Sequence, residues 1–272
     1  MQDRFKERRM AKKHIRIDVL LVERGLAPTR EKAKALLMAG DVIVRNQPVT
    51  KAGTLVDGES VVSVKKPLQY VGRGGEKMAG ALDDFRINPS GMVVLDVGAS
   101  TGGFTDCLLQ RGAIRSYALD VGRGQIHNRL VQDPRVVVIE GVNARNPFYL
   151  PDQADIGVAD VSFISLRLVV PEMVKHLKPG GYLLLLVKPQ FEAERGEVGR
   201  GGVVRDDFVH PRVLGRFTTW AIKQGYRLKG ITKSPLVGDA GNKEFFVLLQ
   251  PQSGVKHEPK LTNEPDTKSV LE

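Results

Sequence analysis

The chain has 272 residues, enough for one large domain and a small second one, and its 42% hydrophobic and 26% charged residues are ordinary for a globular protein. A single cysteine, Cys107, excludes an internal disulfide and a cysteine-rich zinc site, and with five scattered histidines we expect no metal site. The longest apolar run, Tyr182 to Val187, is far shorter than the roughly 20 residues that span a bilayer, and the basic N-terminus lacks the apolar core of a secretory signal. We therefore expect a cytoplasmic protein that makes no membrane contact.

The net charge of +10 is concentrated near the N-terminus. Residues 1–77 hold 17 Lys and Arg against nine Asp and Glu, so this stretch carries +8 of the total. A basic region beside a nearly neutral remainder predicts a polyanionic partner. The alternative is a basic surface that only keeps the protein in solution.

A basic arm, residues 1–15, precedes a predicted small α+β domain at residues 16–65. Apolar spacing indicates two helices in this domain, Ile17 to Arg24 and Arg30 to Ala39, the second with Thr29 as its N-cap. Three short strands are expected after them, at residues 42–44, 54–56 and 61–64.

Residues 16–65 resemble the small RNA-binding domain first known from the fourth protein of the small ribosomal subunit. The resemblance rests on Arg16–Leu21, Thr29–Lys34, Leu36–Val44 and Gly58-Glu59. It implies that the second helix and the turn after the next strand touch RNA, mostly at phosphates, which positions an enzyme more than it reads sequence. The implied RNA contacts are Arg30, Lys32, Lys34 and Arg45, to which we add Arg73 in the basic linker that follows.

That linker, residues 66–76, is rich in glycine and basic residues and leads into a larger domain at 77–250, after which the polar residues 251–272 form a tail. In the larger domain short apolar strands alternate with helices, which predicts an α/β fold with a doubly wound, Rossmann-like parallel sheet. The expected strands are 93–96, 116–120, 136–139, 156–160, 182–187, 230–234 and 244–249, and the expected helices are 78–85, 103–111, 166–177 and 208–224.

The segment from Asp96 to Phe104 predicts the cofactor site, because it joins a strand to a helix through a glycine turn at the edge of the sheet where ligands bind. A phosphate-binding P-loop would end in Gly-Lys-Ser/Thr, and a dinucleotide site would carry glycine where this chain has Ser100. The pattern D-x-G-x-x-x-G-G-F is instead similar to the first motif of S-adenosylmethionine-dependent methyltransferases. Asp120 would then accept the ribose hydroxyls, and Asn143 would meet the adenine. The full set predicted for S-adenosylmethionine is Asp96, Gly98, Ala99, Ser100, Thr101, Gly102, Phe104, Asp120, Asn143 and Asp160.

Four charged residues, Lys77, Asp160, Lys188 and Glu244, lie at the ends of predicted elements. Their Lys-Asp-Lys-Glu order resembles the 2′-O-ribose RNA methyltransferases of the FtsJ type. The segments around them resemble the TlyA (haemolysin A) family of ribosomal RNA methyltransferases, and the resemblance covers residues 16–250. It rests on Gly72–Lys77, Ala159–Ser165, Val187–Glu192 and Gly241–Phe246. It implies 2′-O-methylation of a cytidine in the RNA of ribosomal subunits, with these four residues as the catalytic group, and the basic arm favours action on both subunits.

Lys188 is the residue on which this chemistry depends. A ribose 2′-hydroxyl is a weak acid and a weak nucleophile, so it has to be aimed at the methyl group and lose its proton as the bond forms. The apolar strand before Lys188 disfavours the ammonium, whereas Asp160 favours it, and the sequence leaves open which effect is larger. Lys77 and Glu244 would place the ribose and Lys188. Simpler roles compete: a surface lysine at 188, a helix cap at 160, a surface ion pair at 244 and a phosphate contact at 77.

The glycine-rich residues 192–205 predict a mobile lid over the acceptor site, with a long surface loop as the alternative. Other functions are less consistent with the sequence. A pore-forming haemolysin would need a membrane-spanning or amphipathic segment, and an RNA-binding protein of the haemolysin-labelled group without methyltransferase activity would not need an intact cofactor motif and catalytic group. A methyltransferase acting on base amino groups would carry prolines after Asp160, where this chain has Val-Ser-Phe.

Overall fold

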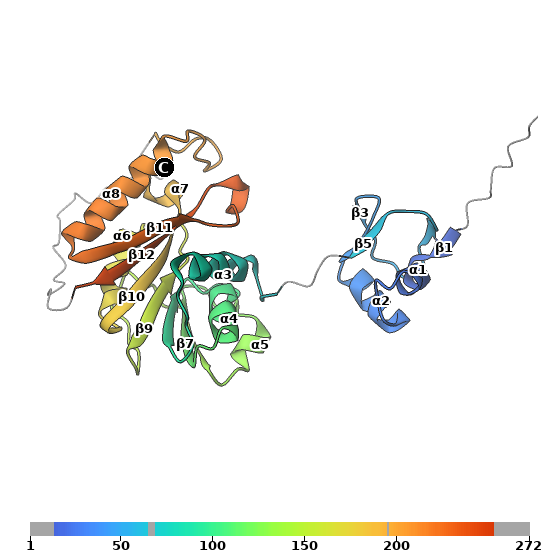
Figure 1. Cartoon of the computed structure of the whole chain (residues 1–272), viewed down its shortest axis with the longest axis horizontal. Coiled ribbons are helices and arrows are strands. Elements are labelled where there is room, and N and C mark those ends of the chain that lie inside the picture. The colour runs from blue at the N-terminus through green and yellow to red at the C-terminus, as the bar shows by residue number, and fades with distance from the viewer. Residues whose placement is uncertain (1–13, 65–68, 195, 253–272) are drawn as a thin grey trace, which may run out of the picture. The chain divides into compact units, whose positions relative to one another are not determined.

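The computed structural model describes residues 14–64, 69–194 and 196–252 and shows two compact units, divided between residues 67 and 68 (Figure 1). Most of the predicted basic arm, and the tail beyond residue 252, lie outside the described residues. Within the described ranges no helix combines the length and the apolarity that a membrane span requires.

The N-terminal unit joins two helices and two small sheets around one aliphatic core. Its elements are β1 (His14–Arg16), α1 (Ile17–Glu23), α2 (Arg30–Met38), β2 (Val42–Val44), β3 (Gln47–Pro48), β4 (Leu55–Asp57) and β5 (Val62–Val64). Leu21, Leu37 and Val42 are fully buried in this core, and residues 14–64 contain no Phe, Tyr or Trp. The backbone N–H of Lys32 donates to the Thr29 hydroxyl at 3.3 Å, so the predicted second helix and its cap are confirmed.

The larger unit is built on a seven-stranded sheet with the order β11-β12-β10-β9-β6-β7-β8. The strands from β10 to β8 in this order run parallel, which confirms the doubly wound fold, and β12 and β11 extend one edge in antiparallel pairing. The strands are β6 (Val93–Val97), β7 (Arg115–Asp120), β8 (Val136–Glu140), β9 (Ala154–Ala159), β10 (Leu177–Val187), β11 (Tyr226–Lys233) and β12 (Phe245–Pro251).

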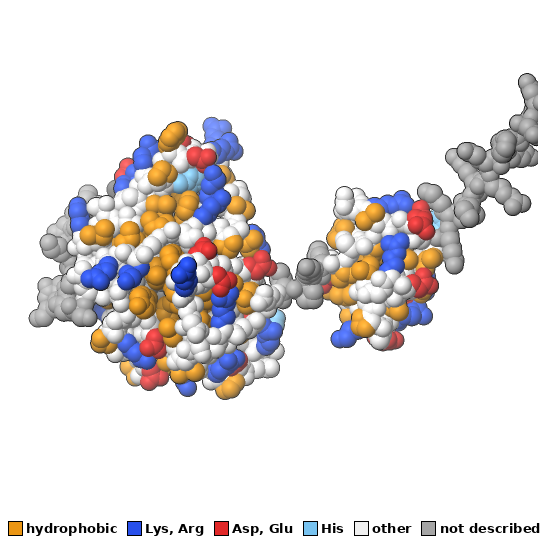
Figure 2. Space-filling view, viewed as in Figure 1, with side chains coloured by type: hydrophobic (Ala, Val, Ile, Leu, Met, Phe, Trp, Pro, Cys, Tyr) orange, Lys and Arg blue, Asp and Glu red, His pale blue; other side chains and the backbone are white. Residues whose placement is uncertain are grey.

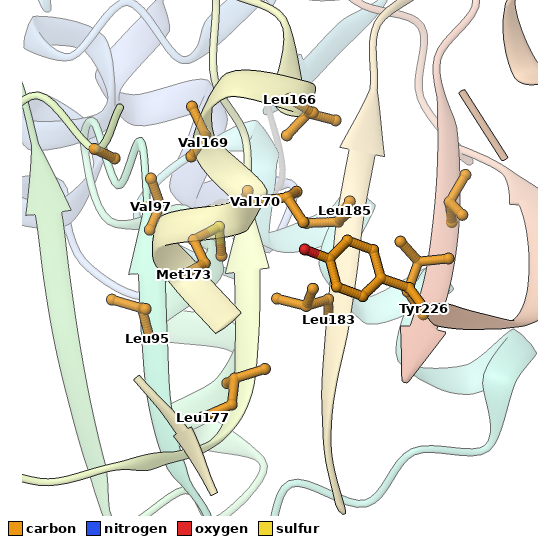
Figure 3. Close-up of a cluster of buried hydrophobic side chains, with 14 of the residues drawn as sticks. Leu95, Val97, Leu166, Val169, Val170, Met173, Leu177, Leu183, Leu185 and Tyr226 are labelled. Carbon is orange, nitrogen blue, oxygen red and sulfur yellow. The ribbon is translucent and has the colours of Figure 1, made fainter. Parts of the chain in front are cut away.

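Helices cover both faces of this sheet, which explains why its central strands are apolar on both sides. One layer contains α6 and α8, with Val170 and Phe217 in the core, and the other contains α3 and α4, with Met78 and Leu108. Figure 3 shows the first core, where side chains of α6 face those of β10. Trp220, on α8, lies beside Phe217 and Tyr226 in this layer. The helices are α3 (Arg73–Phe85), α4 (Gly103–Gln110), α5 (Asn128–Val131), α6 (Leu166–Val174), α7 (Pro189–Glu192) and α8 (Val209–Lys223).

Several element boundaries differ from the sequence expectation. The helix predicted for residues 166–177 ends at Val174, and β10 already begins at Leu177. The Pro-Gly-Gly segment before the expected strand 182–187 lies inside β10, where the pairing with β9 shifts register between Leu177 and Tyr182. Strand β11 begins at Tyr226, four residues before the expected start. Helix α3 begins at Arg73, inside the segment read as a linker.

The order of the strands sets the position of the site. From β6 the chain passes to β7 and β8 on one side, and it then crosses back to β9 on the other side of β6. A crevice forms at such a switch point, at the carboxyl ends of the strands. The glycine turn, Asp120, Asp160 and Lys188 all lie at the carboxyl ends of these parallel strands.

Candidate active site

The glycine turn between β6 and α4 is shaped for close backbone approach. Gly98 and Gly102 have φ angles of +78° and +92°, a region that favours glycine. A Cβ atom at Gly98 would collide with the carbonyl oxygen of Asp160, and one at Gly102 would collide with Leu130. The backbone of Ser100 is also in the left-handed region, with a φ of +48°, and its N–H donates to Asp120 Oδ2 at 2.7 Å. The turn is therefore fixed against the ends of β7 and β9.

Asp96 lies behind this turn and lines neither of the two cavities described below. Its Oδ2 accepts hydrogen bonds from the Thr105 N–H at 3.0 Å and from the Thr105 hydroxyl at 2.7 Å. Burial raises the pKa of Asp96 to about 7, even though the bonds from Thr105 favour the carboxylate. Gly102 likewise stays out of the cavity walls, so both residues hold the start of α4 in place.

A cavity of about 760 Å³ opens beside the turn. It brings together five of the predicted cofactor residues, namely Gly98, Ser100, Asp120, Asn143 and Asp160. The Asp120 carboxylate is held from one side by the N–H groups of Ser100 and Gly122, each at 2.7 Å, which leaves acceptor positions for further donors. Other residues that line this cavity were not predicted from the sequence, among them Val121, Gln125, Val142 and Leu168. Val121 and Val142 directly precede or follow predicted residues at strand ends, and that position is the signal that could have found them.

A second cavity, of about 230 Å³, adjoins the first. The two share Gly98, Ser100, Asp160 and Ser162 in their walls. The remaining lining residues include three predicted cofactor residues, Ala99, Thr101 and Phe104, and three predicted catalytic residues, Lys77, Lys188 and Glu244.

The four predicted catalytic residues form two ion pairs in the wall of this second cavity. Lys188 Nζ lies 2.7 Å from Asp160 Oδ1, although the angles there do not make a hydrogen bond, and it donates to the Ser162 hydroxyl at 2.8 Å. Lys77 Nζ donates to Glu244 Oε2 at 2.5 Å. The side chains of Lys188 and Lys77 are only 12% and 10% exposed, and that of Glu244 is 2% exposed. Desolvated ion pairs of this kind hold their atoms at defined positions.

Two residues of the loop after β9 complete the site, and the sequence analysis gave neither a role. Ser162 accepts the hydrogen bond from Lys188. Phe163 is 91% exposed, has a φ of +62°, and lies 5.0 Å from the ring of Phe191, centroid to centroid. An exposed phenylalanine cannot be told from a core phenylalanine by sequence, because exposure is set by the loop conformation.

The predicted RNA contacts of the N-terminal unit are paired but exposed. Arg30 lies 2.7 Å from the buried Asp18, and Arg45 lies 3.0 Å from Asp57, yet the two arginine side chains are 52% and 60% exposed. The hydrogen bond from Arg16 and the pairing with Arg30 hold the pKa of Asp18 well below its usual range. Figure 2 shows basic side chains beside acidic and hydrophobic ones on the visible face of this unit.

The remaining predicted contacts lie in different units. Lys32 and Lys34 are exposed on α2. Arg73 begins α3 in the larger unit, called the catalytic unit below, and its guanidinium donates to the Val237 carbonyl at 2.9 Å.

The segment read as a lid, residues 192–205, is anchored to its surroundings at several points, while Gly196 and residues 199–202 are exposed. Val204 is buried against Val209 and Val213 of the α8 region, and Glu197 forms an ion pair with Arg216 at 2.5 Å. The N–H of Val204 donates to Asn242 Oδ1 at 3.0 Å, two residues before Glu244. Closure on RNA stays a prediction. No group of three metal-ligating side chains occurs among the residues that the structure describes.

Comparison with known proteins agrees with this geometry. Residues 70–251 match the family described as FtsJ-like methyltransferase, and residues 15–62 match the S4 domain. The protein YqxC from Bacillus subtilis (strain 168) is 47% identical over 244 residues, which cover 88% of this chain and 87% of YqxC. The 16S/23S rRNA (cytidine-2′-O)-methyltransferase TlyA from Mycobacterium tuberculosis (strain ATCC 25618 / H37Rv) is 43% identical over 242 residues, 88% of this chain and 90% of that protein.

A solved structure, described as "Putative hemolysin from Streptococcus thermophilus", is 40% identical, has a TM-score of 0.68, and covers 89% of this chain and 90% of that chain. The two family matches lie in different units, and the FtsJ-like match includes every residue of the two cavities. The chain therefore belongs to the TlyA (haemolysin A) family of FtsJ-like methyltransferases, with an S4 domain at its N-terminus.

Proposed function

We propose that the protein methylates the ribose 2′-hydroxyl of a cytidine in ribosomal RNA, with S-adenosylmethionine as methyl donor. The observation that carries this proposal is the junction of the two cavities. One cavity has the acceptors of a nucleoside site, the other has two lysine–carboxylate pairs, and they meet at Asp160 and Ser162. A methyl group passing from a donor in the first cavity to a hydroxyl in the second would cross this junction.

The first cavity fits S-adenosylmethionine. The Asp120 carboxylate is held by two backbone N–H groups and keeps acceptor positions for a pair of ribose hydroxyls. Asn143 offers an amide for the adenine edge, and Gly98 forms part of the wall, packed so closely against Asp160 that a Cβ there has no room. When bound, the cofactor would supply an electrophilic methyl group on a positively charged sulfur.

The second cavity supplies what the hydroxyl needs. Lys188 is held by Asp160 and Ser162, so its amine has a fixed position beside the junction. A neutral amine there would accept the hydroxyl proton, and an ammonium would stabilise the developing oxyanion. The Lys77–Glu244 pair, which lines the same cavity, would hold the ribose. In this proposal the two ion pairs fix the positions of their charged groups, and these charges orient the hydroxyl and stabilise it as it loses its proton.

RNA as the acceptor class is supported by the S4 domain and by the exposed cations of α2. Ribosomal RNA and the cytidine are supported by the relative from Mycobacterium tuberculosis, whose name states that reaction. An acceptor of this kind agrees with the cytoplasmic location expected from the sequence.

A label-transfer assay tests the proposal. Full-length protein is incubated with tritiated S-adenosylmethionine and separate, unmodified small and large ribosomal subunits, and the labelled RNA is digested to nucleosides for mass spectrometry. We expect 2′-O-methylcytidine with the wild type and a rate at least about 1,000-fold lower with Lys188→Ala.

Lys178→Ala is the matched control, because Lys178 pairs with Asp155 at 2.9 Å and joins the same two strands at their opposite end. It should label RNA at the wild-type rate. If the RNA of neither subunit carries label, the protein binds RNA without methyltransferase activity. If the label lies on a base, the reaction is not 2′-O-methylation.

A further inference from the structure

Two cross-links join the loop after β9 to the short helix α7. One is the pair of Lys188 with Asp160, at the active site. The other is made by Glu192 at the far end of α7. Glu192 Oε2 accepts a hydrogen bond from the Ser165 hydroxyl at 2.7 Å, and Oε1 accepts one from the Leu166 N–H at 2.6 Å. Both segments are therefore held at both of their ends.

The Glu192 carboxylate is a buried charge site with a built environment. Its side chain is 2% exposed, and burial raises its pKa above the usual range for a glutamate. The N-terminus of α6 compensates, since free N–H groups and the helix dipole favour an anion there. Ser165 is the N-cap of α6, and its hydroxyl accepts from the Arg167 N–H at 3.2 Å while donating to Glu192. A carboxylate with these partners fixes the chain at Ser165 and Leu166.

The fixed point lies close to the reacting groups along both segments. Three residues separate Glu192 from Lys188, and the Phe191 N–H donates to the Lys188 carbonyl at 2.9 Å across that turn. In the loop after β9, two residues separate Ser165 from Ser162, which accepts the Lys188 hydrogen bond. The intervening Phe163 has a φ of +62°, a conformation that a non-glycine residue keeps only when its surroundings impose it.

We propose that Glu192 is a positioning residue for methyl transfer: it lines neither cavity, and it holds Ser162 and Asp160 at the height of Lys188. This inference rests on the proposed function. Without the hydrogen bonds to Glu192, β9 is unchanged, but the loop that follows it loses the anchor that sets its distance from α7. Misplacement of a reacting group by about 1 Å lowers rates by about 100-fold.

The test uses Glu192→Gln in the full chain, which keeps the size of the side chain and replaces one acceptor oxygen by a donor that faces Ser165 or Leu166. We expect kcat for RNA methylation to fall about 10- to 100-fold, with the Kd for S-adenosylmethionine changed less than about twofold. Ser165→Ala, which removes one of the two bonds, should lower kcat less. It keeps the inference testable if Glu192→Gln does not fold.

A double-mutant cycle with Ser162→Ala separates positioning from general stability. If Glu192 acts through Ser162, the Glu192→Gln change lowers kcat less in the Ser162→Ala background than in the wild type. Asp155→Asn is the control, because Asp155 also accepts a backbone N–H, from Val93 at 2.8 Å, at the other end of β9. It should lower the melting temperature and leave kcat unchanged.

An unchanged kcat in Glu192→Gln, or additive effects in the cycle, would overturn the inference and leave the proposed function standing. Absence of RNA methylation by the wild type would overturn both.

Discussion

The arginine pairs of the N-terminal unit and the lysine pairs of the active site differ in how far their charges are removed from water. In the N-terminal unit the carboxylate is buried and the arginine stays largely in water, as with Arg30 on Asp18. At the active site of the catalytic unit both members of a pair are withdrawn from water, as with Lys77 and Glu244. A surface that binds a polyanion needs cations that phosphates can reach, whereas a reaction centre needs charges that hold one position. The same residue types therefore serve binding or chemistry according to how far they are desolvated.

Breaking the buried pair should have the largest effect. Glu244→Ala leaves the Lys77 ammonium buried without its partner, and we expect it to lower the unfolding free energy of the catalytic unit by about 3 to 5 kcal/mol. Arg45→Ala breaks an exposed pair of the N-terminal unit and should lower the stability of that unit by less than about 1 kcal/mol. Hydrogen exchange of each unit within the full chain measures both, and equal losses would remove the distinction between the units.

The two buried aspartates should respond to pH in opposite directions, and the effect at Asp96 is the larger. Its pKa of about 7 in the folded protein is above the ordinary value near 4, so the folded state binds more protons between these limits. Stability from this group is present below about pH 4 and is lost as the pH rises to about 7, by roughly 4 kcal/mol. Asp96→Asn should remove this loss. Urea unfolding of both proteins at several pH values checks it, and parallel stability curves would contradict it.

Asp18 should show the reverse dependence. Its pKa is lowered by Arg16 and Arg30, so its contribution is complete at neutral pH, starts to decrease as the pH falls below about 4, and is lost only as the pH falls through the lowered pKa of the folded state. We expect Asp18→Asn to destabilise the N-terminal unit by about 2 kcal/mol at pH 7 and by clearly less near pH 2. Hydrogen exchange over residues 14–64 measures this difference, and a variant equally unstable at both pH values would contradict it.

The smallest effect is expected for the exposed lysines of α2. Lys32→Ala combined with Lys34→Ala should weaken RNA binding by several-fold and lower the salt dependence of the dissociation constant by up to about two ions, with kcat unchanged. Lys175→Ala, an exposed lysine on α6's C-terminal side that pairs with Glu172, serves as control. A changed kcat in the double variant would give α2 a part in the chemistry and weaken the contrast between the units.

Their positions at predicted strand ends were enough to bring Asp160 and Lys188 together, whereas the resemblance to the FtsJ type supplied the roles of the four predicted catalytic residues. Asp160 and Lys188 each follow a parallel strand, and the carboxyl ends of parallel strands meet at one edge, so residues distant in the chain had to converge there. The role of Thr29 as the N-cap of α2 could also be predicted, because a threonine directly before a helical pattern commonly caps the helix.

Residues whose roles depend on tertiary contacts were not readable in this way. Asp96 was assigned to the ligand because it stands near a strand end, but side chains alternate along β6, and Asp96 points with Val94 towards α4 and Thr105. Ser162, Phe163 and Glu192 depend on the loop after β9, whose conformation is set by its contacts with α7. The Pro-Gly-Gly segment of β10 shows the same limit, since it lies inside the strand at an irregularity in the pairing with β9 that the residue pattern does not reveal.

The absence of Tyr and Trp from residues 14–64 also makes the two units distinguishable by absorbance and fluorescence. All five tyrosines and the one tryptophan of the chain lie beyond residue 68, and Trp220 is packed beside Phe217 and Tyr226 in the α8 layer. Absorbance and fluorescence excited near 280 nm therefore come from the catalytic unit alone. A change in Trp220 emission reports that unit even while the other is bound to RNA or unfolded, so the protein carries its own unit-specific optical probe.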